Sequence, residues 1–156
     1  MSRSLYLINP AADFPTYYGA EVYAGRGYRP AVGLADLVVP TLAAMVPDDF
    51  GVHLCDEHIE PVDFDLDVDY VGITGKISQW GRTKSIAAAF RRRGKTVIIG
   101  GPNASLCPEM VRPHCDVLVT GELEDWLEIE VDAGMVWDFP TLSKLAAELY
   151  SEFEAA

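Results

Sequence analysis

The sequence predicts an α/β fold with a five-stranded, mainly parallel sheet and helices on both of its faces. Short segments rich in branched apolar residues alternate along the chain with segments whose apolar residues recur at helical spacing. Glycine directly follows three of the short segments, at Gly75, at Gly100-Gly101 and at Gly121. Five such strands favour the flavodoxin-like order 2-1-3-4-5, a three-layer sandwich with its ligand crevice between strands one and three.

Five apolar segments are the expected strands. The first, residues 4–10, is mostly apolar and is expected to be central in the sheet and covered on both faces. The strand at 96–99 runs into Gly100-Gly101. A double glycine taken alone suits a tight strand-to-helix turn as well as it suits a ligand site. The other expected strands are 50–55, 70–74 and 116–120.

Helical spacing predicts helices between these strands. Pro30 is well placed to start the first helix, and Pro40, inside its pattern, should kink it or shift its start. The next helix is expected from about Ser78, a fair N-cap, to Gly94, which suits the position just past a helix end. A short helix is expected at 108–111.

Two stretches lack a regular period. Residues 11–28 are rich in glycine, proline and tyrosine, and we expect this loop to be poorly ordered or to lie over the strand ends. Its tyrosines suit a cap over a planar ligand and equally suit an aromatic loop that touches nothing. Between residues 63 and 69, aspartates alternate with apolar residues. This alternation is compatible with a strand, but the carboxylates favour a solvated loop.

The carboxyl-terminal part of the chain carries a weaker signal. We expect a first unit at 1–125 and an acidic tail with a helix at 126–156. After Pro140, apolar residues at helical spacing form one face of that last helix. They are Leu142, Leu145, Ala146, Leu149 and Phe153.

Composition excludes several classes of function. The chain has 156 residues, the size of one domain, and its 12 basic against 24 acidic residues give a net charge of −12. That charge repels phosphate backbones, so nucleic acid is not an expected partner. The three cysteines have no C-x-x-C spacing, which argues against a zinc site or a disulfide framework and predicts a reducing, cytoplasmic setting. No segment approaches the roughly 20 apolar residues of a membrane span.

Three ligand classes of this fold are disfavoured by residues that the chain lacks. A dinucleotide enzyme needs G-x-G-x-x-G directly after a strand, but Gly25-Arg26-Gly27 lies well past strand one and has no third glycine. A flavodoxin needs a Ser, Thr and Gly phosphate loop where this chain has residues 9–13. A phosphorelay receiver needs an aspartate and a lysine at strand ends that here carry Thr74 and Thr120.

With these residues in view, the chain resembles the cobalamin-binding domain that precedes the catalytic barrel of cobalamin-dependent radical S-adenosylmethionine enzymes. The resemblance covers about residues 4–125 and depends on the order and spacing of several motifs, none of which is specific alone. The motifs are Pro30-Ala31-Val32-Gly33-Leu34, the segment from Asp56-Glu57 to Pro61, Val71-Gly72-Ile73-Thr74-Gly75, Arg91-Arg92-Arg93-Gly94, Gly100-Gly101-Pro102 and Gly121-Glu122-Leu123-Glu124-Asp125.

The resemblance implies cobalamin as the cofactor. In such domains the corrin ring lies over the carboxyl ends of the strands, and the nucleotide tail enters the crevice beside strands three and four. Small residues are needed there because a side chain would fill the channel. The implied cofactor-binding residues are Gly33, Leu34, Thr74, Gly75, Lys76, Gly100, Gly101, Pro102, Asn103, Thr120, Gly121 and Glu122.

The chain departs from the family pattern in the cobalt ligand. Relatives with a histidine below the cobalt carry D-x-H-x-x-G after strand one, and residues 28–33 keep only the glycine of that motif. We therefore expect cobalamin to bind base-off, with no histidine ligand and no metal-ligating residue in this chain. His58 lies in a similar motif after strand two, where a loop histidine is expected to be solvated.

The chain also lacks the C-x-x-x-C-x-x-C motif that holds the iron–sulfur cluster of radical chemistry. No catalytic residue is therefore assigned, and any enzymatic role is expected to require a separate radical S-adenosylmethionine enzyme or methyltransferase as partner. Two classes of function stay open at this point. One is a cobalamin-carrying module, and the other is an interaction or scaffold module that keeps the fold without the cofactor.

Overall fold

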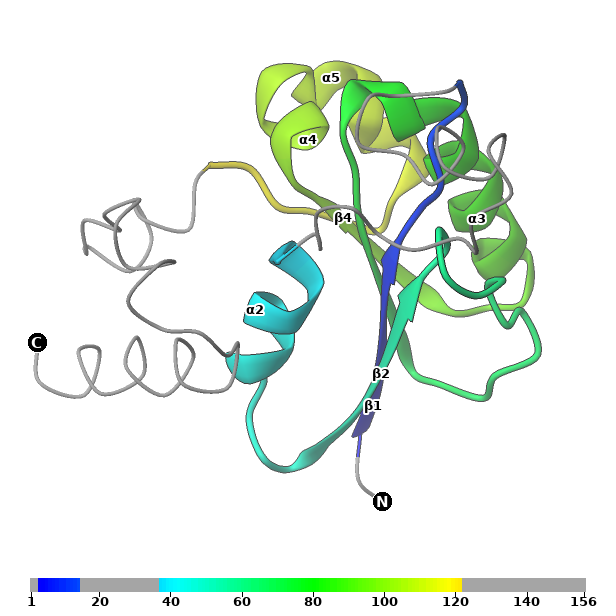
Figure 1. Cartoon of the computed structure of the whole chain (residues 1–156), viewed down its shortest axis with the longest axis vertical. Helices are drawn as coiled ribbons and strands as arrows, with labels where there is room; N and C mark the ends of the chain where they lie inside the picture. The colour runs from blue at the N-terminus through cyan, green and yellow to red at the C-terminus, as the bar shows by residue number, and fades with distance from the viewer. Residues whose placement is uncertain (1–2, 15–36, 122–156) are drawn as a thin grey trace, which may run out of the picture.

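The computed structural model describes residues 3–14 and 37–121, which form a parallel sheet with helices on both faces (Figure 1). All strand pairs are parallel and their order is β2-β1-β3-β4-β5, as the sequence predicts. The strands are β1 Arg3–Asn9, β2 Phe50–Asp56, β3 Tyr70–Thr74, β4 Thr96–Gly100 and β5 Val117–Leu118.

Helices cover the two faces unequally. Among the described helices in Figure 1, α2 lies on one side of the sheet and α3 packs against the other side. The α-helices are α2 Val38–Ala44, α3 Trp80–Arg92, α4 Pro102–Leu106 and α5 Pro108–Val111, and the short 3₁₀ helices are Ile77–Gln79 and Arg112–His114.

The hydrophobic core lies between the sheet and α3. Phe90 of α3 is fully buried, and its ring contacts Tyr6 at 6.1 Å and Phe64 at 5.4 Å between ring centroids. The strand residues that face α3 alternate with those that face α2, because successive side chains of a strand point to opposite faces. On the α3 side they are almost completely buried: Ile8, Val71, Ile73, Val97 and Ile99.

The start of α3 differs from the prediction. Ser78 is not the N-cap, because it lies in the 3₁₀ turn Ile77–Gln79 and α3 begins at Trp80. The carboxylate of Asp13, which follows β1, accepts hydrogen bonds from the backbone N–H groups of Gly81 and Arg82 instead. A residue distant in sequence therefore caps this helix.

The end of α3 follows the prediction. Gly94 has a φ of 73°, and the N–H groups of Gly94 and Lys95 donate to the carbonyls of Arg91 and Phe90. This is a Schellman motif, which a glycine just past the helix end favours. Arg91 also forms an ion pair with Asp116 at 3.2 Å, so this arginine anchors the helix end to the β5 segment.

Smaller differences concern strand and helix bounds. The first strand ends at Asn9, one residue before Pro10, which has no N–H for the ladder. Strand β5 is only Val117–Leu118, although the N–H of Val119 still donates to Ile99 at 2.9 Å. Pro40 lies in the first turn of α2, where its missing N–H costs no helical hydrogen bond, so it fits a shifted helix start.

Several predictions fall outside the described residues or concern loops. The 15–28 part of the tyrosine-rich loop, the helix start at Pro30 and the 126–156 tail all lie outside them. The acidic stretch 63–69 is a loop and not a strand, as its aspartates predict. Within residues 3–14 and 37–121, no helix is long and apolar enough to cross a membrane.

Candidate functional site: a cleft with a glycine floor

A cleft of about 300 Å³ lies between α2 and the sheet and reaches the carboxyl ends of β3 and β4. One wall is the inner side of α2, with Val38, Val39 and Leu42. The floor is the α2-facing side of the sheet, with side chains from β1, β3 and β4. The cleft thus borders β1 and β3, where the fold predicts a ligand crevice, and extends across β4.

Two strand glycines make the floor hollow. Gly72 in β3 and Gly100 in β4 both line the cleft, and neither has a side chain to fill it. A β-carbon at Gly100 would lie 3.4 Å from Cβ of Val119, which is close to ordinary van der Waals contact. A β-carbon at Gly72 would lie 2.7 Å from Cδ2 of Leu7. Gly72 therefore makes room for the side chain of Leu7 in the cleft floor, and Gly100 leaves its side of the floor without a side chain.

Gly101 has a different role from Gly100. Its φ of 91° is a conformation that residues with a side chain rarely adopt. A β-carbon there would lie 2.8 Å from Oγ1 of Thr74 and 3.2 Å from the backbone nitrogen of Gly75. Gly101 therefore lets the β4–α4 turn approach the end of β3, and the chain requires glycine there whether or not a ligand is present.

Asn103 is an unusual polar residue at the same edge. Its side chain is buried, with the residue 5% exposed, and its backbone N–H donates to the carbonyl of Gly75 at 3.1 Å. Its side-chain Oδ1 is buried and has no hydrogen-bond partner among the described residues. An unpaired buried polar atom costs about 1–3 kcal/mol, and in a native protein such an atom calls for an explanation.

Gln79 is the opposite case, a buried side-chain amide whose groups are all paired. Its Nε2 donates to Oδ1 of Asn9 at 3.0 Å and to the carbonyl of Pro10, and its Oε1 accepts the N–H of Lys76 at 2.8 Å. One side chain therefore ties the segment after β1 to the segment after β3. This contact fixes the two strand ends between which a ligand would enter.

Ser105 fixes the segment that follows β5. Its Oγ accepts the N–H of Gly121 at 3.0 Å and lies 3.3 Å from the carbonyl oxygens of Gly101 and Gly121. The segment after β5 is thereby held against α4. Gly121 lines the cleft, so this serine shapes the cleft mouth.

The structure brings many of the predicted site residues together. Gly75, Lys76 and Asn103 lie at the carboxyl edge without lining the cleft. Gly33, Leu34 and Glu122 lie outside the described residues. Five predicted residues line the cleft, namely Thr74, Gly100, Gly101, Pro102 and Gly121, and Thr120 lines an adjoining cavity.

Sequence reasoning missed other residues of the site. Gly72 is a floor residue, and its signal was available as a glycine inside an apolar strand, which often marks a close approach. Leu7 and Ile98 also line the cleft, but strand periodicity alone cannot tell which face a covering helix leaves open. Ser105 carried no sequence signal, because its role depends on a contact with Gly121.

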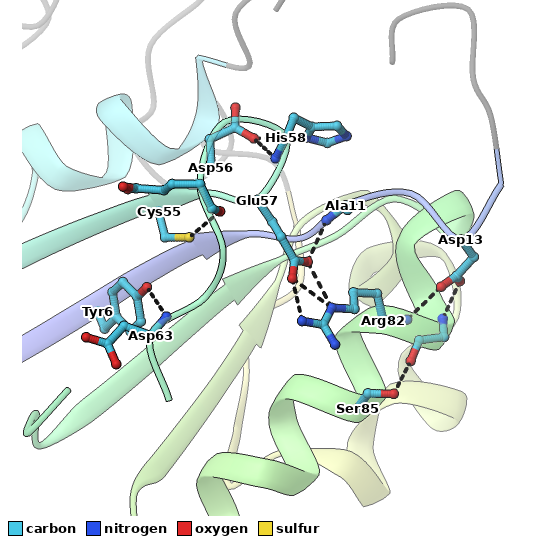
Figure 2. Close-up of polar contacts among 12 residues, drawn as sticks. Tyr6, Ala11, Asp13, Cys55, Asp56, Glu57, His58, Asp63, Arg82 and Ser85 are labelled. Atoms are coloured by element: carbon cyan, nitrogen blue, oxygen red, sulfur yellow. Dashed lines mark hydrogen bonds and ion pairs between the residues drawn. The ribbon is translucent and has the colours of Figure 1, made fainter. Parts of the chain in front are cut away.

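His58 follows the edge strand β2 and pairs with the carboxylate at the end of that strand. Its Nδ1 lies 2.9 Å from Oδ1 of Asp56, and its backbone N–H donates to the same oxygen at 3.0 Å (Figure 2). This is a local turn contact. Among the described residues that line the cleft there is no histidine.

Two carboxylates fasten the segment after β1 to α3 (Figure 2). Glu57 accepts the N–H of Ala11 at 2.9 Å and forms a two-pronged ion pair with Arg82. Asp13 caps the helix at Gly81 and Arg82. The chain is thereby held at the carboxyl edge of the sheet immediately before residue 15.

The pKa of Glu57 predicts how its ion pair with Arg82 responds to acid. Burial raises that pKa, but the hydrogen bonds from Arg82 and Ala11 outweigh it, so the pKa of Glu57 lies below its ordinary value. A lowered folded pKa stabilises the protein above pH 4.5, and the contribution is lost as the pH falls through the folded pKa. Arg82→Met should therefore lower the free energy of unfolding by about 1–3 kcal/mol at neutral pH, and by progressively less in acid.

Urea unfolding at neutral and at acidic pH measures this difference. Lys95→Met is the control, because Lys95 pairs with Asp67, whose side chain is 99% exposed, and such a pair contributes about 0–1 kcal/mol. An Arg82→Met loss that stayed constant from neutral to acidic pH would contradict the assigned ion pair.

Large hydrophobic side chains are exposed in the segments that follow the strands. Each of the strands β1 to β4 is followed by a segment that carries one of them, and for β4 that segment is α4. A flat apolar ligand or a partner surface would be favoured over these side chains. The four side chains are Phe14 at 57% exposure, Ile59 at 66%, Ile77 at 65% and Leu106 at 81%.

Comparison with known proteins finds a similarity to part of a methyltransferase. The chain is similar to part of the bacteriochlorophyllide d C-8(2)-methyltransferase of Chlorobaculum tepidum, with 37% identity over 93 residues, which are 59% of this chain and 21% of that enzyme. The matched region therefore spans about a fifth of the length of that relative. No protein-family model matches the chain, and no solved structure matches it.

Proposed function

We propose that this protein is a cobalamin-binding module that serves a methyltransferase-type enzyme. The observation that carries the proposal is the cleft with its floor of Gly72 and Gly100, open at the carboxyl edge of the sheet. A volume of about 300 Å³ is at the lower end of ordinary ligand sites, which suits one arm of a larger ligand.

The residues of the site fit the two parts of such a cofactor. The apolar cleft walls would take the planar base of the nucleotide tail, in contact with Leu7, Val39 and Ile98. The exposed apolar edge, with Ile77 and Leu106, would lie under the flat face of the corrin ring. When bound, cobalamin supplies a cobalt centre that can carry a methyl group.

Polar groups at the edge would orient the cofactor. Asn103 has a buried side-chain oxygen with no hydrogen-bond partner in the described part of the chain, and the amide side chains of a corrin ring are suitable donors for it. Backbone N–H groups around Gly75 and Gly100-Gly101 are the donors that we propose for the phosphate of the tail. Neutral donors suit a chain with a net charge of −12, which has few cations available for phosphate.

The methyltransferase relative supports the reaction context. The family resembled by the sequence includes methyltransferase-type enzymes, and the relative is by its name a methyltransferase. The aligned residues are 21% of that enzyme, so we propose that the catalytic part is supplied by another domain or a separate chain. In this arrangement, the residues described here bind and position the cofactor, and catalysis takes place on the partner.

Co-elution with hydroxocobalamin tests the proposal. The full chain is incubated with excess hydroxocobalamin and passed over a desalting column, and the visible spectrum of the protein fraction is recorded. We expect stoichiometric retention with a base-off spectrum, and the same spectrum for His58→Ala. A protein fraction without cobalamin absorbance would favour the interaction module that keeps the fold without the cofactor.

A further inference from the structure

A second apolar cavity continues the cleft toward the amino ends of the strands. It has a volume of about 490 Å³ and shares walls with the cofactor cleft at Ile98, Val119 and Gly121. Its own walls include Met45, Pro47, Phe50 and Tyr70. These four residues are not part of the proposed cofactor site.

Burial differs between the two faces of the sheet. On the α3 side, Val97 and Ile99 of β4 are 0% and 2% exposed. On the α2 side, Val119 is 53% exposed and Ile98 is only partly buried. Helix α2 has 7 residues and is about 10 Å long, whereas a strand of 7 residues such as β1 runs about 23 Å. Within the described residues, α2 is therefore too short to cover this face.

We propose that residues 141–153 of the same chain form a helix that packs into this second cavity. The segment carries Leu142, Leu145 and Leu149 on one helical face. Lys144 and Ser151 lie on the opposite face. A helix of this length is about 20 Å long, which matches the length of the uncovered sheet face. Burying that apolar face would stabilise the sheet side that α2 leaves open.

The path of the chain favours this occupant. Gly121, the last described residue, borders both cavities, so the chain leaves the described part at the groove itself. The 20 residues between Gly121 and Leu142 reach any point of the sheet, because an extended chain spans about 3.3 Å per residue. A second copy is disfavoured, because each chain carries a net charge of −12 and two copies repel. The proposal does not depend on cobalamin binding.

Disulfide trapping in the full chain tests the packing. Val119 and Leu149 are both replaced by cysteine in a background with Cys107→Ser and Cys115→Ser, and the buried Cys55 is left in place. A mild thiol oxidant should then form an intramolecular disulfide at a rate independent of protein concentration. The matched control pairs Val119→Cys with Ser151→Cys, about 200° around the helix from Leu149, and should react at least about ten-fold more slowly.

Each result of this experiment decides the proposal. Equal rates for the two pairs, absence of a disulfide in both, or covalent dimers in place of the intramolecular product would overturn it. Hydrogen exchange gives a second readout that needs no cysteine. The double variant Leu145→Asp and Leu149→Asp should speed amide exchange at 117–119, whereas Ser151→Asp should not. Unchanged exchange at 117–119 in the double variant would also overturn the proposal.

Discussion

Gly100→Leu is expected to abolish cobalamin binding, with a loss of affinity of at least about a hundred-fold. Gly100 lines the cleft in a regular strand conformation, and a β-carbon there would meet Cβ of Val119 at 3.4 Å, an easily adjusted contact. The further carbons of leucine would extend into the 300 Å³ cleft and fill the space proposed for the nucleotide tail. Retention of hydroxocobalamin on a desalting column, followed by its visible absorbance, measures the loss.

Gly51→Leu is the matched control for this substitution. Gly51 is an exposed glycine of β2, and among the described residues a β-carbon there would meet only the carbonyl of Arg3, at 3.9 Å. The same change in side chain should therefore leave binding intact. Gly100→Ala should give an intermediate loss, which separates filling of the cleft from unfolding. Tight binding retained in a folded Gly100→Leu variant would rule out the cleft as the tail site.

Gly101→Leu is a poorer test, although the sequence alone suggests it. A side chain there would be strained by the φ of 91° and would collide with Thr74 and Gly75. Loss of binding in that variant would therefore report on the β4–α4 turn as much as on a filled channel. The sequence shows two adjacent glycines as equivalent, and only the structure separates their roles.

Much of the fold could be predicted because it depends on local periodicity. The alternation of buried strands such as 70–74 with helical segments is enough to predict a parallel sheet and its order. The start of α3 could not be predicted in this way, because the residue that caps it, Asp13, is distant from it in the sequence. Ser78 has the right residue type for a cap, and tertiary contact overrides that local preference.

The candidate site was predictable at its strand ends and not in its interior. Gly100 is the last residue of β4 and Gly121 follows β5, and the carboxyl ends of parallel strands meet at one edge. Gly72 lies inside a strand, and its importance depends on which face α2 covers, which no single-strand pattern contains. The prediction of Asn103 as a site residue depended on a resemblance. The lack of a partner for its oxygen among the described residues is visible only in the folded structure.

Asn103→Leu is expected to change stability and binding in opposite directions. The Oδ1 of Asn103 is buried without a partner among the described residues, so its removal should raise the free energy of unfolding of the cofactor-free protein by up to about 1–2 kcal/mol. If this oxygen accepts a hydrogen bond from the cofactor, the same variant should bind hydroxocobalamin about ten-fold more weakly. Urea unfolding and titration of the visible spectrum measure the two effects.

Gln79→Leu is the matched control for this prediction. Gln79 is also a buried side-chain amide at the carboxyl edge, but its groups are paired with Asn9, Pro10 and Lys76. Its replacement removes the donor of two buried acceptors, Oδ1 of Asn9 and the carbonyl of Pro10, and should destabilise the protein by at least about 2 kcal/mol. A destabilising Asn103→Leu would mean that the asparagine serves the fold in the way Gln79 does. A stable variant with unchanged affinity would show that Asn103 is not part of the cofactor site, because its buried oxygen would then accept no hydrogen bond from the cofactor.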